Sequence, residues 1–289
     1  SQAREVFDEV LYHLLILSEN TSDFSRLAAV AQELQYYDWQ SRQALRRLRR
    51  DAAGGGAGIT LGPLAEGWEA PTGGRPLLEI TGLTLHSPGL PPRLLVRNLS
   101  VSLARGGLLL TGPSGAGKTT VLRAVAGLWL RGSGAIRRDM DSRRVLFLPQ
   151  QPYMQLGTLR EQLLYPFGDS ELDDDGLLDI LERLDLGHIV RRVGGDLAAT
   201  RRWGDELSLG EQQRLSVGRV LVHRPALAIL DETTAANDVA HERTMYECVS
   251  KACQAFLSVG HRASIEAFHR QKLTLLGEGG DGRWELQAL

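Results

Sequence analysis

The chain has 289 residues, a length that fits one large α/β domain with an appendage or two modest domains. Its 33 Lys and Arg residues against 35 Asp and Glu residues give a formal net charge of −2, which argues against the strongly basic balance of nucleic-acid-binding proteins. A hydrophobic fraction of 43% argues against a disordered chain, and no run reaches about 18 uninterrupted apolar residues, so we expect no segment of this sequence to span a membrane.

The first part of the chain predicts a helical segment followed by a linker. Apolar residues recur every four positions from Val6 to Leu14, a period typical of an amphipathic helix, so residues 1–50 are predicted as a helical segment. Residues 51–76 are rich in Gly and Pro, and such a composition predicts a flexible linker. We expect the main globular domain over residues 77–289.

In the main domain, short apolar runs alternate with helical periods. The predicted strands are residues 78–85, 94–103, 108–111, 145–148, 227–230, 255–259, 272–276 and 283–286. The predicted helices are residues 118–128, 159–165, 176–184, 209–223, 239–254 and 263–269. Strands that alternate with helices predict an α/β fold whose sheet has parallel strands at its centre.

The sharpest motif is a complete G-x-x-x-x-G-K-[ST] phosphate loop from Gly112 to Thr119. It follows the apolar run 108–110 and opens a predicted helix, which is the context that the motif requires. Glycines let backbone N–H groups turn inward around phosphate oxygens, and the helix directs its positive end toward them. Lys118 can reach the β- and γ-phosphates, and the Thr119 hydroxyl can ligate Mg²⁺.

A second motif is the apolar strand 226–230 followed by Asp231 and Glu232. Side chains after a central parallel strand lie at the carboxyl edge of the sheet, beside the predicted phosphate loop. Asp231 suits the Mg²⁺ shell, and Glu232 suits a base that polarises an attacking water.

Three further segments resemble motifs of the ATP-binding-cassette (ABC) ATPases. Residues 207–214, Leu-Ser-Leu-Gly-Glu-Gln-Gln-Arg, resemble the family's Leu-Ser-Gly-Gly-Gln signature. Residues 147–153 look like its glutamine loop, and residues 258–261 look like its switch-histidine segment. The motifs follow one another in the family's order, and the resemblance covers residues 77–289.

This resemblance implies a P-loop NTPase fold of ABC ATPase type, with a mixed sheet whose core is parallel, an antiparallel β subdomain and a helical subdomain. It also implies that two such domains pack head to tail and enclose two ATP molecules with Mg²⁺. Each site would take its phosphate loop from one chain and its signature, with Ser208 and the Gly210 N–H, from the other.

The candidate site residues fall into three groups. The catalytic residues are Glu232 and His261, and the metal-binding residues are Thr119, Gln150 and Asp231. The ATP-binding residues are Gly112, Pro113, Ser114, Gly115, Ala116, Gly117, Lys118, Thr119, Thr120, Ser208, Gly210 and Glu211.

Some residues depart from the family's usual pattern. Leu209 takes the place of the first signature glycine, and Glu211 takes the place of the glutamine. Ser87 stands where most members carry an aromatic ring that stacks on adenine, so weaker adenine selectivity is a hypothesis. We expect hydrolysis, because the phosphate-loop lysine, the acidic pair and the switch histidine are all present.

Finer resemblance points to subfamily D, the peroxisomal fatty-acyl transporters, the lysosomal cobalamin exporter and their bacterial and plastid relatives. The segment from Pro149 to Pro166 and residues 127–129 are similar to that group. These are half-transporters, so the implied partners are a second half-transporter chain and a transmembrane domain of the same polypeptide, with no nucleic acid. Residues 1–50 would extend the last membrane helix, and the chain, which opens with Ser1, would be a piece of a longer protein.

The expected function is ATP hydrolysis that powers export or import of a fatty-acyl or cobalamin-type substrate. The implied location is a membrane of a peroxisome, lysosome, plastid or bacterial inner membrane, with this portion on the cytosolic or stromal side. Two alternatives stay open, a non-hydrolysing regulatory or dimerisation cassette and a soluble ABC ATPase without a transport role.

Overall fold

A computed structural model of the chain describes residues 58–64, 76–87, 91–139, 141–277 and 281–289. The chain divides into two compact units, Ser1–Gly56 and Ala57–Leu289, and the described residues all belong to the second. The predicted helical segment 1–50 lies outside the described residues, as does most of the predicted linker.

The secondary structure alternates between strands and helices along the chain. The strands are β1 (Ile59–Gly62), β2 (Leu78–His86), β3 (Leu94–Leu103), β4 (Gly106–Thr111), β5 (Gly132–Arg138), β6 (Val145–Leu148), β7 (Gly157–Thr158), β8 (Thr200–Arg201), β9 (Leu227–Asp231), β10 (Ala255–Val259), β11 (His269–Leu275) and β12 (Trp284–Ala288). The helices are α2 (Lys118–Ala126), α3 (Leu159–Leu164), α4 (Asp174–Arg183), α5 (Gly187–Arg192), α6 (Trp203–Glu206), α7 (Leu209–His223) and α8 (Val239–Ala252), with the 3₁₀ helices η1 (Ser142–Arg144) and η2 (Ala263–Phe268).

The central sheet has the strand order β12-β11-β4-β10-β9-β6. Its strands run parallel except β12, which pairs antiparallel with β11 at one edge. Strands β9 and β10 are buried along their whole length, as expected for apolar strands covered on both faces. The predicted sheet with a parallel core is therefore confirmed.

A second sheet has the order β1-β5-β2-β3, in which β2 runs antiparallel to both β3 and β5. Its antiparallel pairs confirm the expected β subdomain, and β1 pairs parallel with β5. Strand β1 lies inside the segment that the sequence predicted as a flexible linker, so that prediction was wrong for Ile59–Gly62. Four residues can form this strand because the edge of β5 supplies their hydrogen-bonding partners.

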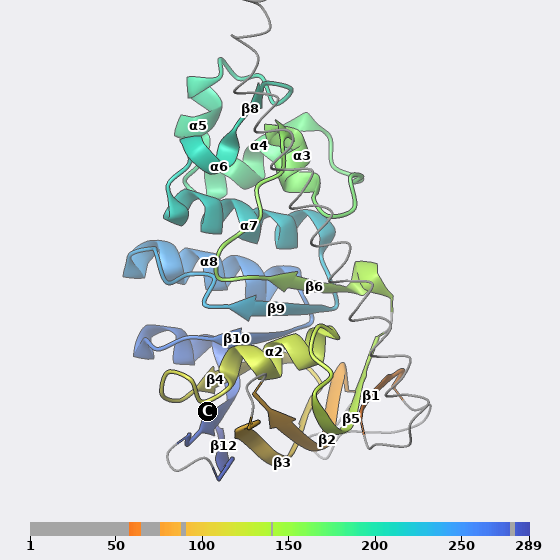
Figure 1. The fold of residues 1–289 in the computed structure, drawn as a ribbon. Coiled ribbons are helices and arrows are strands. Elements are labelled where there is room, and N and C mark those ends of the chain that lie inside the picture. The colour runs from red at the N-terminus through yellow and green to blue at the C-terminus, as the bar shows by residue number, and fades with distance from the viewer. Residues whose placement is uncertain (1–57, 65–75, 88–90, 140, 278–280) are drawn as a thin grey trace, which may run out of the picture. The chain divides into compact units, whose positions relative to one another are not determined.

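Two apolar cores lie on either side of the central sheet. One core joins the helices α3–α8 to one face of the sheet, and the other joins α2 to the opposite face and to the second sheet. Figure 1 shows α3–α7 gathered at one end, the central sheet in the middle and the second sheet at the other end. Among the described residues, no helix combines the length and apolarity needed to cross a membrane.

The segment predicted as a helix over residues 263–269 forms the 3₁₀ helix η2 instead, followed directly by β11. His269, the first residue of β11, is buried beside Ser258. Its Nδ1 lies 2.7 Å from the carbonyl oxygen of Ile265, which can only accept, and its Nε2 lies 2.7 Å from the Ser258 hydroxyl. A neutral ring satisfies both contacts, and burial lowers the pKa of His269 to about 4.

We expect this buried imidazole to make the domain sensitive to mild acid. Between pH 6.5 and 4 the unfolded chain takes up a proton that folded His269 does not, so stability falls as the pH falls, by up to about 3 kcal/mol. Urea unfolding across this pH range measures the effect. The variant His269→Gln removes the titrating group, and an unchanged pH slope in that variant would contradict this origin.

Candidate nucleotide-binding site

The predicted site residues outside the signature segment converge at the carboxyl edge of the central sheet. Leu110 of β4, Val259 of β10 and Asp231 of β9 pair at the same level across three adjacent parallel strands. The segments that follow these strands therefore leave the sheet side by side. Figure 1 shows β6 and β9 pointing in the same direction toward this edge.

The phosphate loop connects β4 to the first turn of α2. Gly112, Gly115 and Gly117 all have positive φ, at 135°, 74° and 101°, which is backbone that glycine adopts most readily. The Lys118 ammonium donates to the carbonyl oxygens of Gly112 at 2.9 Å and Pro113 at 3.0 Å. Burial lowers the pKa of Lys118, and the nearby carboxylates oppose that shift. The loop thus forms a curl with a buried ammonium inside it.

Asp231 connects the phosphate loop to the acidic pair. The Thr119 hydroxyl donates to Asp231 Oδ1 at 3.0 Å, and Asp231 is buried. Burial raises the pKa of Asp231, and the Thr119 hydrogen bond opposes that shift. A hydroxyl and a carboxylate oxygen are the hard donors that Mg²⁺ prefers, so the residues present fit this ion.

Glu232 lies between two of the other predicted residues. Gln150 Nε2 donates to Glu232 Oε2 at 2.8 Å, and His261 Nε2 lies 3.5 Å from Glu232 Oε1. The backbone of Glu232 has a φ of 47°, in the left-handed region that non-glycine residues rarely adopt. Such strain persists where surrounding contacts hold it, and it is common at functional sites.

The signature residues form a separate group at the start of α7. Ser208 caps the helix by accepting from the Glu211 N–H at 3.3 Å, and its hydroxyl donates to Glu211 Oε2 at 2.7 Å. His188 Nε2 lies 2.6 Å from the other oxygen of Glu211. Burial opposes ionisation, but the hydrogen bonds from His188 and Ser208 outweigh it and lower the pKa of Glu211 to about 2. Among the described residues, no hydrogen bond joins Ser208, Gly210 or Glu211 to the phosphate loop.

Ser87 has a structural role in the loop between β2 and β3. Its N–H donates to the Arg93 carbonyl at 2.8 Å, and its hydroxyl accepts from the Arg93 N–H at 2.9 Å. The guanidinium of Arg93 in turn donates to the carbonyl of Gly115 in the phosphate loop. Ser87 is therefore hydrogen-bonded to Arg93, whose side chain contacts the phosphate loop.

Sequence reasoning missed two residues that hold the site together, Gln213 and Arg262. Arg262 donates to the Asn237 carbonyl at 2.8 Å and lies 3.3 Å from the buried carboxylate of Glu242. Its position directly after His261 was the available signal, since a basic residue there can bridge neighbouring loops. Gln213 was hidden because its polar side chain lies in a helix, where exposure to water is the usual outcome.

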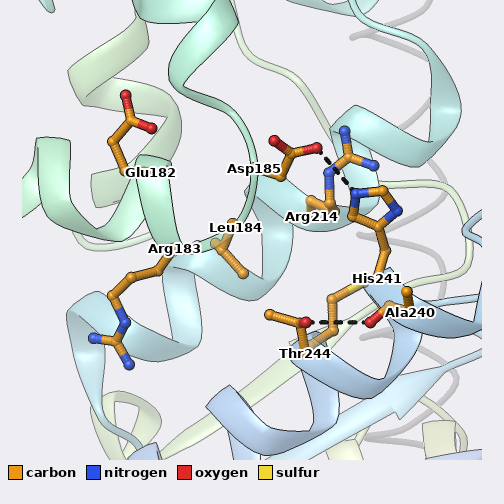
Figure 2. A pocket seen from close by; sticks show the side chains of 9 residues that line it. Glu182, Arg183, Leu184, Asp185, Arg214, Ala240, His241 and Thr244 are labelled. Atoms are coloured by element: carbon orange, nitrogen blue, oxygen red, sulfur yellow. Dashed lines mark hydrogen bonds and ion pairs between the residues drawn. The ribbon is translucent and has the colours of Figure 1, made fainter.

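A cavity of about 220 Å³ lies away from this cluster, between the end of α4 and helices α7 and α8. Figure 2 shows His241 and Arg214 lining it opposite Asp185. His241 Nε2 lies 3.0 Å from Asp185, and its Nδ1 lies 2.8 Å from Asp238 at the start of α8. Hydrogen bonds from the His241 ring to Asp185 and Asp238 raise the pKa of His241. At this pocket, charged side chains from α7 and from the segment after α4 meet His241 of α8.

A phosphate loop at the carboxyl edge of a parallel sheet, beside a buried Asp and an adjacent Glu, defines a P-loop nucleotide-binding domain. Residues 96–235 match the family model described as ABC transporter. Among solved structures, a bacterial Atm1-family ABC exporter with ATP bound shares the fold, with a TM-score of 0.63 and 22% identity over 78% of this chain and 40% of that chain.

Sequence relatives narrow the family. An ABC transporter ATP-binding protein of Synechocystis is 48% identical over 213 residues, which cover 73% of this chain and 31% of that protein. The human lysosomal cobalamin transporter ABCD4 is 41% identical over 77% of this chain and 38% of that protein. The chloroplastic ABC transporter D family member 2 of Arabidopsis thaliana is 40% identical over 68% of this chain and 34% of that protein.

The chain belongs to the ABC transporter family and carries its ATP-binding domain. The predicted resemblance to subfamily D is confirmed by these relatives. The chain spans about a third of the length of the curated relatives described above.

The phosphate loop yields a prediction about two of its glycines. A Cβ at Gly112 would lie 2.2 Å from the carbonyl oxygen of Leu275, whereas a Cβ at Gly115 would lie 3.8 Å from the Arg93 guanidinium. We expect Gly112→Ala to cost about 3 kcal/mol of the free energy of unfolding, because the loop must move away from β11. Gly115→Ala adds only left-handed strain, about 1 kcal/mol. Urea unfolding of both variants gives the comparison, and equal costs would contradict the role of the Leu275 contact.

Proposed function

We propose that this chain binds Mg-ATP and hydrolyses it to power an ABC half-transporter of subfamily D type. The observation that carries the proposal is the position of the Glu232 carboxylate, held between Gln150 and His261 at the edge that also bears Lys118 and Asp231. Phosphoryl transfer to water requires a base, a cation near the phosphates and a site for Mg²⁺. Glu232, Lys118 and the Thr119–Asp231 pair supply these groups at one edge of the central sheet.

Each residue has a role in the proposed reaction. Incoming phosphate oxygens replace the Gly112 and Pro113 carbonyls as partners of the Lys118 ammonium, and the N–H groups of the loop and of α2 bind the remaining oxygens. Thr119, Asp231 and Gln150 would hold Mg²⁺, which would supply positive charge against the bound phosphates.

The chemical step uses Glu232 and His261. Glu232 accepts a proton from the attacking water while the water oxygen bonds to the γ-phosphorus and the bond from that phosphorus to the bridging oxygen of ADP breaks. The Gln150 amide donates to the carboxylate and holds its orientation. His261 donates to the γ-phosphate and stabilises the charge that develops there. Backbone strain at Glu232 fits a side chain that is held in one orientation.

The proposed site is completed by a second chain. Ser208, Gly210 and Glu211 lie at the N-terminus of α7, away from the phosphate loop of their own chain, and would face the γ-phosphate bound by a partner half-transporter chain. The Leu209 side chain is 45% exposed at the same helix end, which suits a contact with another surface. This arrangement favours two composite sites in a head-to-tail dimer.

The transported substrate and the location are proposals from the relatives. One relative is named a lysosomal cobalamin transporter and another is named a chloroplastic ABC transporter, which supports a cofactor-type substrate and a membrane location. The fatty-acyl alternative rests on the resemblance to subfamily D alone. The transmembrane partner would belong to the same polypeptide, and the organelle stays open among peroxisome, lysosome, plastid and bacterial inner membrane. The formal charge of −2 supports a role without nucleic acid.

The first experiment measures Mg-ATP hydrolysis against protein concentration for this chain and for Glu232→Gln. We expect activity to rise more steeply than linearly, because each site needs two chains, and to fall by about 10² to 10⁴-fold in the variant while ATP still binds. Activity that is linear in concentration would contradict the composite site. A chain that binds ATP but never turns over, even joined to its membrane part, would favour the non-hydrolysing alternative, which Leu209 in the signature motivates.

The residue at position 87 predicts the nucleotide preference. Stacking of an aromatic ring on a base is worth about 1–3 kcal/mol, and Ser87 supplies no ring while its hydroxyl is engaged by Arg93. We therefore expect ATP and GTP to bind with dissociation constants within about threefold of each other. Equilibrium titration with each nucleotide and Mg²⁺ measures the ratio, and a strong preference for ATP would remove the hypothesis.

A further inference from the structure

Gln213 is a buried polar side chain in α7, one helical turn beyond Gly210, with an exposed fraction of 1%. A buried amide must satisfy two donor and two acceptor positions, so its partners are informative. Its contacts extend to two segments that are separate in the sequence, Gln150 and residues 232–237, and these segments carry the Gln150 and Glu232 side chains of the proposed active site.

The amide of Gln213 uses its nitrogen on one side and its oxygen on the other. Nε2 donates to the carbonyl oxygen of Gln150 at 3.1 Å and, more weakly, to that of Glu232 at 3.5 Å. Oε1 accepts from the Ala236 N–H at 3.0 Å and from Asn237 Nδ2 at 3.0 Å. The orientation of the amide is fixed by these partners, because the reverse orientation would oppose donor to donor and acceptor to acceptor.

The two groups that accept from Gln213 Nε2 are backbone carbonyls of residues whose side chains belong to the proposed site. The Gln150 carbonyl belongs to the residue whose side chain donates to the Glu232 carboxylate. The Glu232 carbonyl opens the turn that continues to Ala236 and Asn237 and also accepts from the Ala235 N–H at 3.2 Å. In the described part of the chain, no other side chain hydrogen-bonds to all of these segments.

We propose that Gln213 is a positioning residue that couples the signature helix α7 to the Gln150 segment and to the Ala236–Asn237 turn, and so fixes the orientation of Glu232. The role of Glu232 as base rests on the proposed function, whereas the coupling itself rests on the contacts of Gln213.

The proposed coupling acts along helix α7, which carries both the signature residues and Gln213. Helix α7 belongs to the helical layer (Figure 1) and is the longest of the described helices. Ser208 caps its N-terminus, and Gly210 lies in its first turn. A displacement of that first turn moves Gln213 with it, because both lie on one rigid helix. Through its amide the displacement reaches the Gln150 segment and the strained backbone of Glu232, so contact at the signature alters the geometry of the base in the same chain.

Two substitutions separate the two sides of the amide. Gln213→Glu keeps both acceptor contacts with the Ala236–Asn237 turn but sets a carboxylate oxygen against the Gln150 and Glu232 carbonyls. Gln213→Met has a similar length and removes every contact. Gln162→Glu is the matched control, because Gln162 is equally buried and its amide donates to the Gln155 carbonyl at 2.9 Å and accepts from the Gln155 N–H at 3.1 Å.

Backbone hydrogen exchange of the whole chain measures the proposed coupling and does not depend on ATP hydrolysis. We expect faster exchange in residues 147–152 for Gln213→Glu, and in both residues 147–152 and 233–238 for Gln213→Met. The control should speed exchange only near residues 153–158. Identical exchange of both segments in wild type and Gln213→Met, with both proteins folded, would overturn the coupling.

Kinetics then read the effect on Glu232. We expect kcat to fall by about 10²-fold in both Gln213 variants, because a displaced base loses most of its effect. The dissociation constant for ATP without Mg²⁺, measured in the Glu232→Gln background, should change by less than about threefold, because Lys118 and the rest of the phosphate loop are untouched. The control should keep the wild-type kcat per folded molecule.

The outcomes separate this inference from the proposed function. Faster exchange with an unchanged kcat would overturn the positioning role. A wild-type chain that never hydrolyses ATP contradicts the proposed function by itself, and the exchange of residues 147–152 and 233–238 then supports or overturns the coupling independently.

Discussion

The register of three parallel strands is the constraint on which the site depends. Because Leu110, Val259 and Asp231 pair at one level, the chain leaves the sheet at one edge three times, with the phosphate loop, the switch histidine and the acidic pair. The hydrogen bond from Thr119 to Asp231 spans 112 positions of sequence and is possible only in this register. Both faces of β9 and β10 are buried, so a slip of one residue would exchange the side chains that pack on the two sides of the sheet.

The N-terminus of α7, which carries the signature residues, already holds a negative charge of its own. A helix N-terminus attracts anions, yet here the ionised carboxylate of Glu211 already occupies the end of the helix and engages the Ser208 hydroxyl. His188 lies against the same carboxylate and offsets part of its charge when protonated. A phosphate that approaches this end therefore meets a group whose hydrogen bonds must rearrange.

Local patterns made much of the fold and site predictable from the sequence. The phosphate loop and the acidic pair follow apolar strands, and each motif consists of consecutive residues, so both can be identified from the sequence alone. Strand β5 escaped prediction because Ile136 is its only large apolar residue, and β1 escaped because its pairing depends on β5. The contacts of Gln213 could not be predicted, since they join segments that only the tertiary structure brings together.

The two apolar cores have a consequence for how a bound ligand affects the molecule. The core around α2 lies directly under the phosphate loop, whereas the core of the helical layer touches the opposite face of the central sheet. A ligand bound at the phosphate loop therefore contacts the α2 side directly. Any change it causes in the helical layer must be transmitted by the central sheet and by the polar contacts at the edge of that sheet.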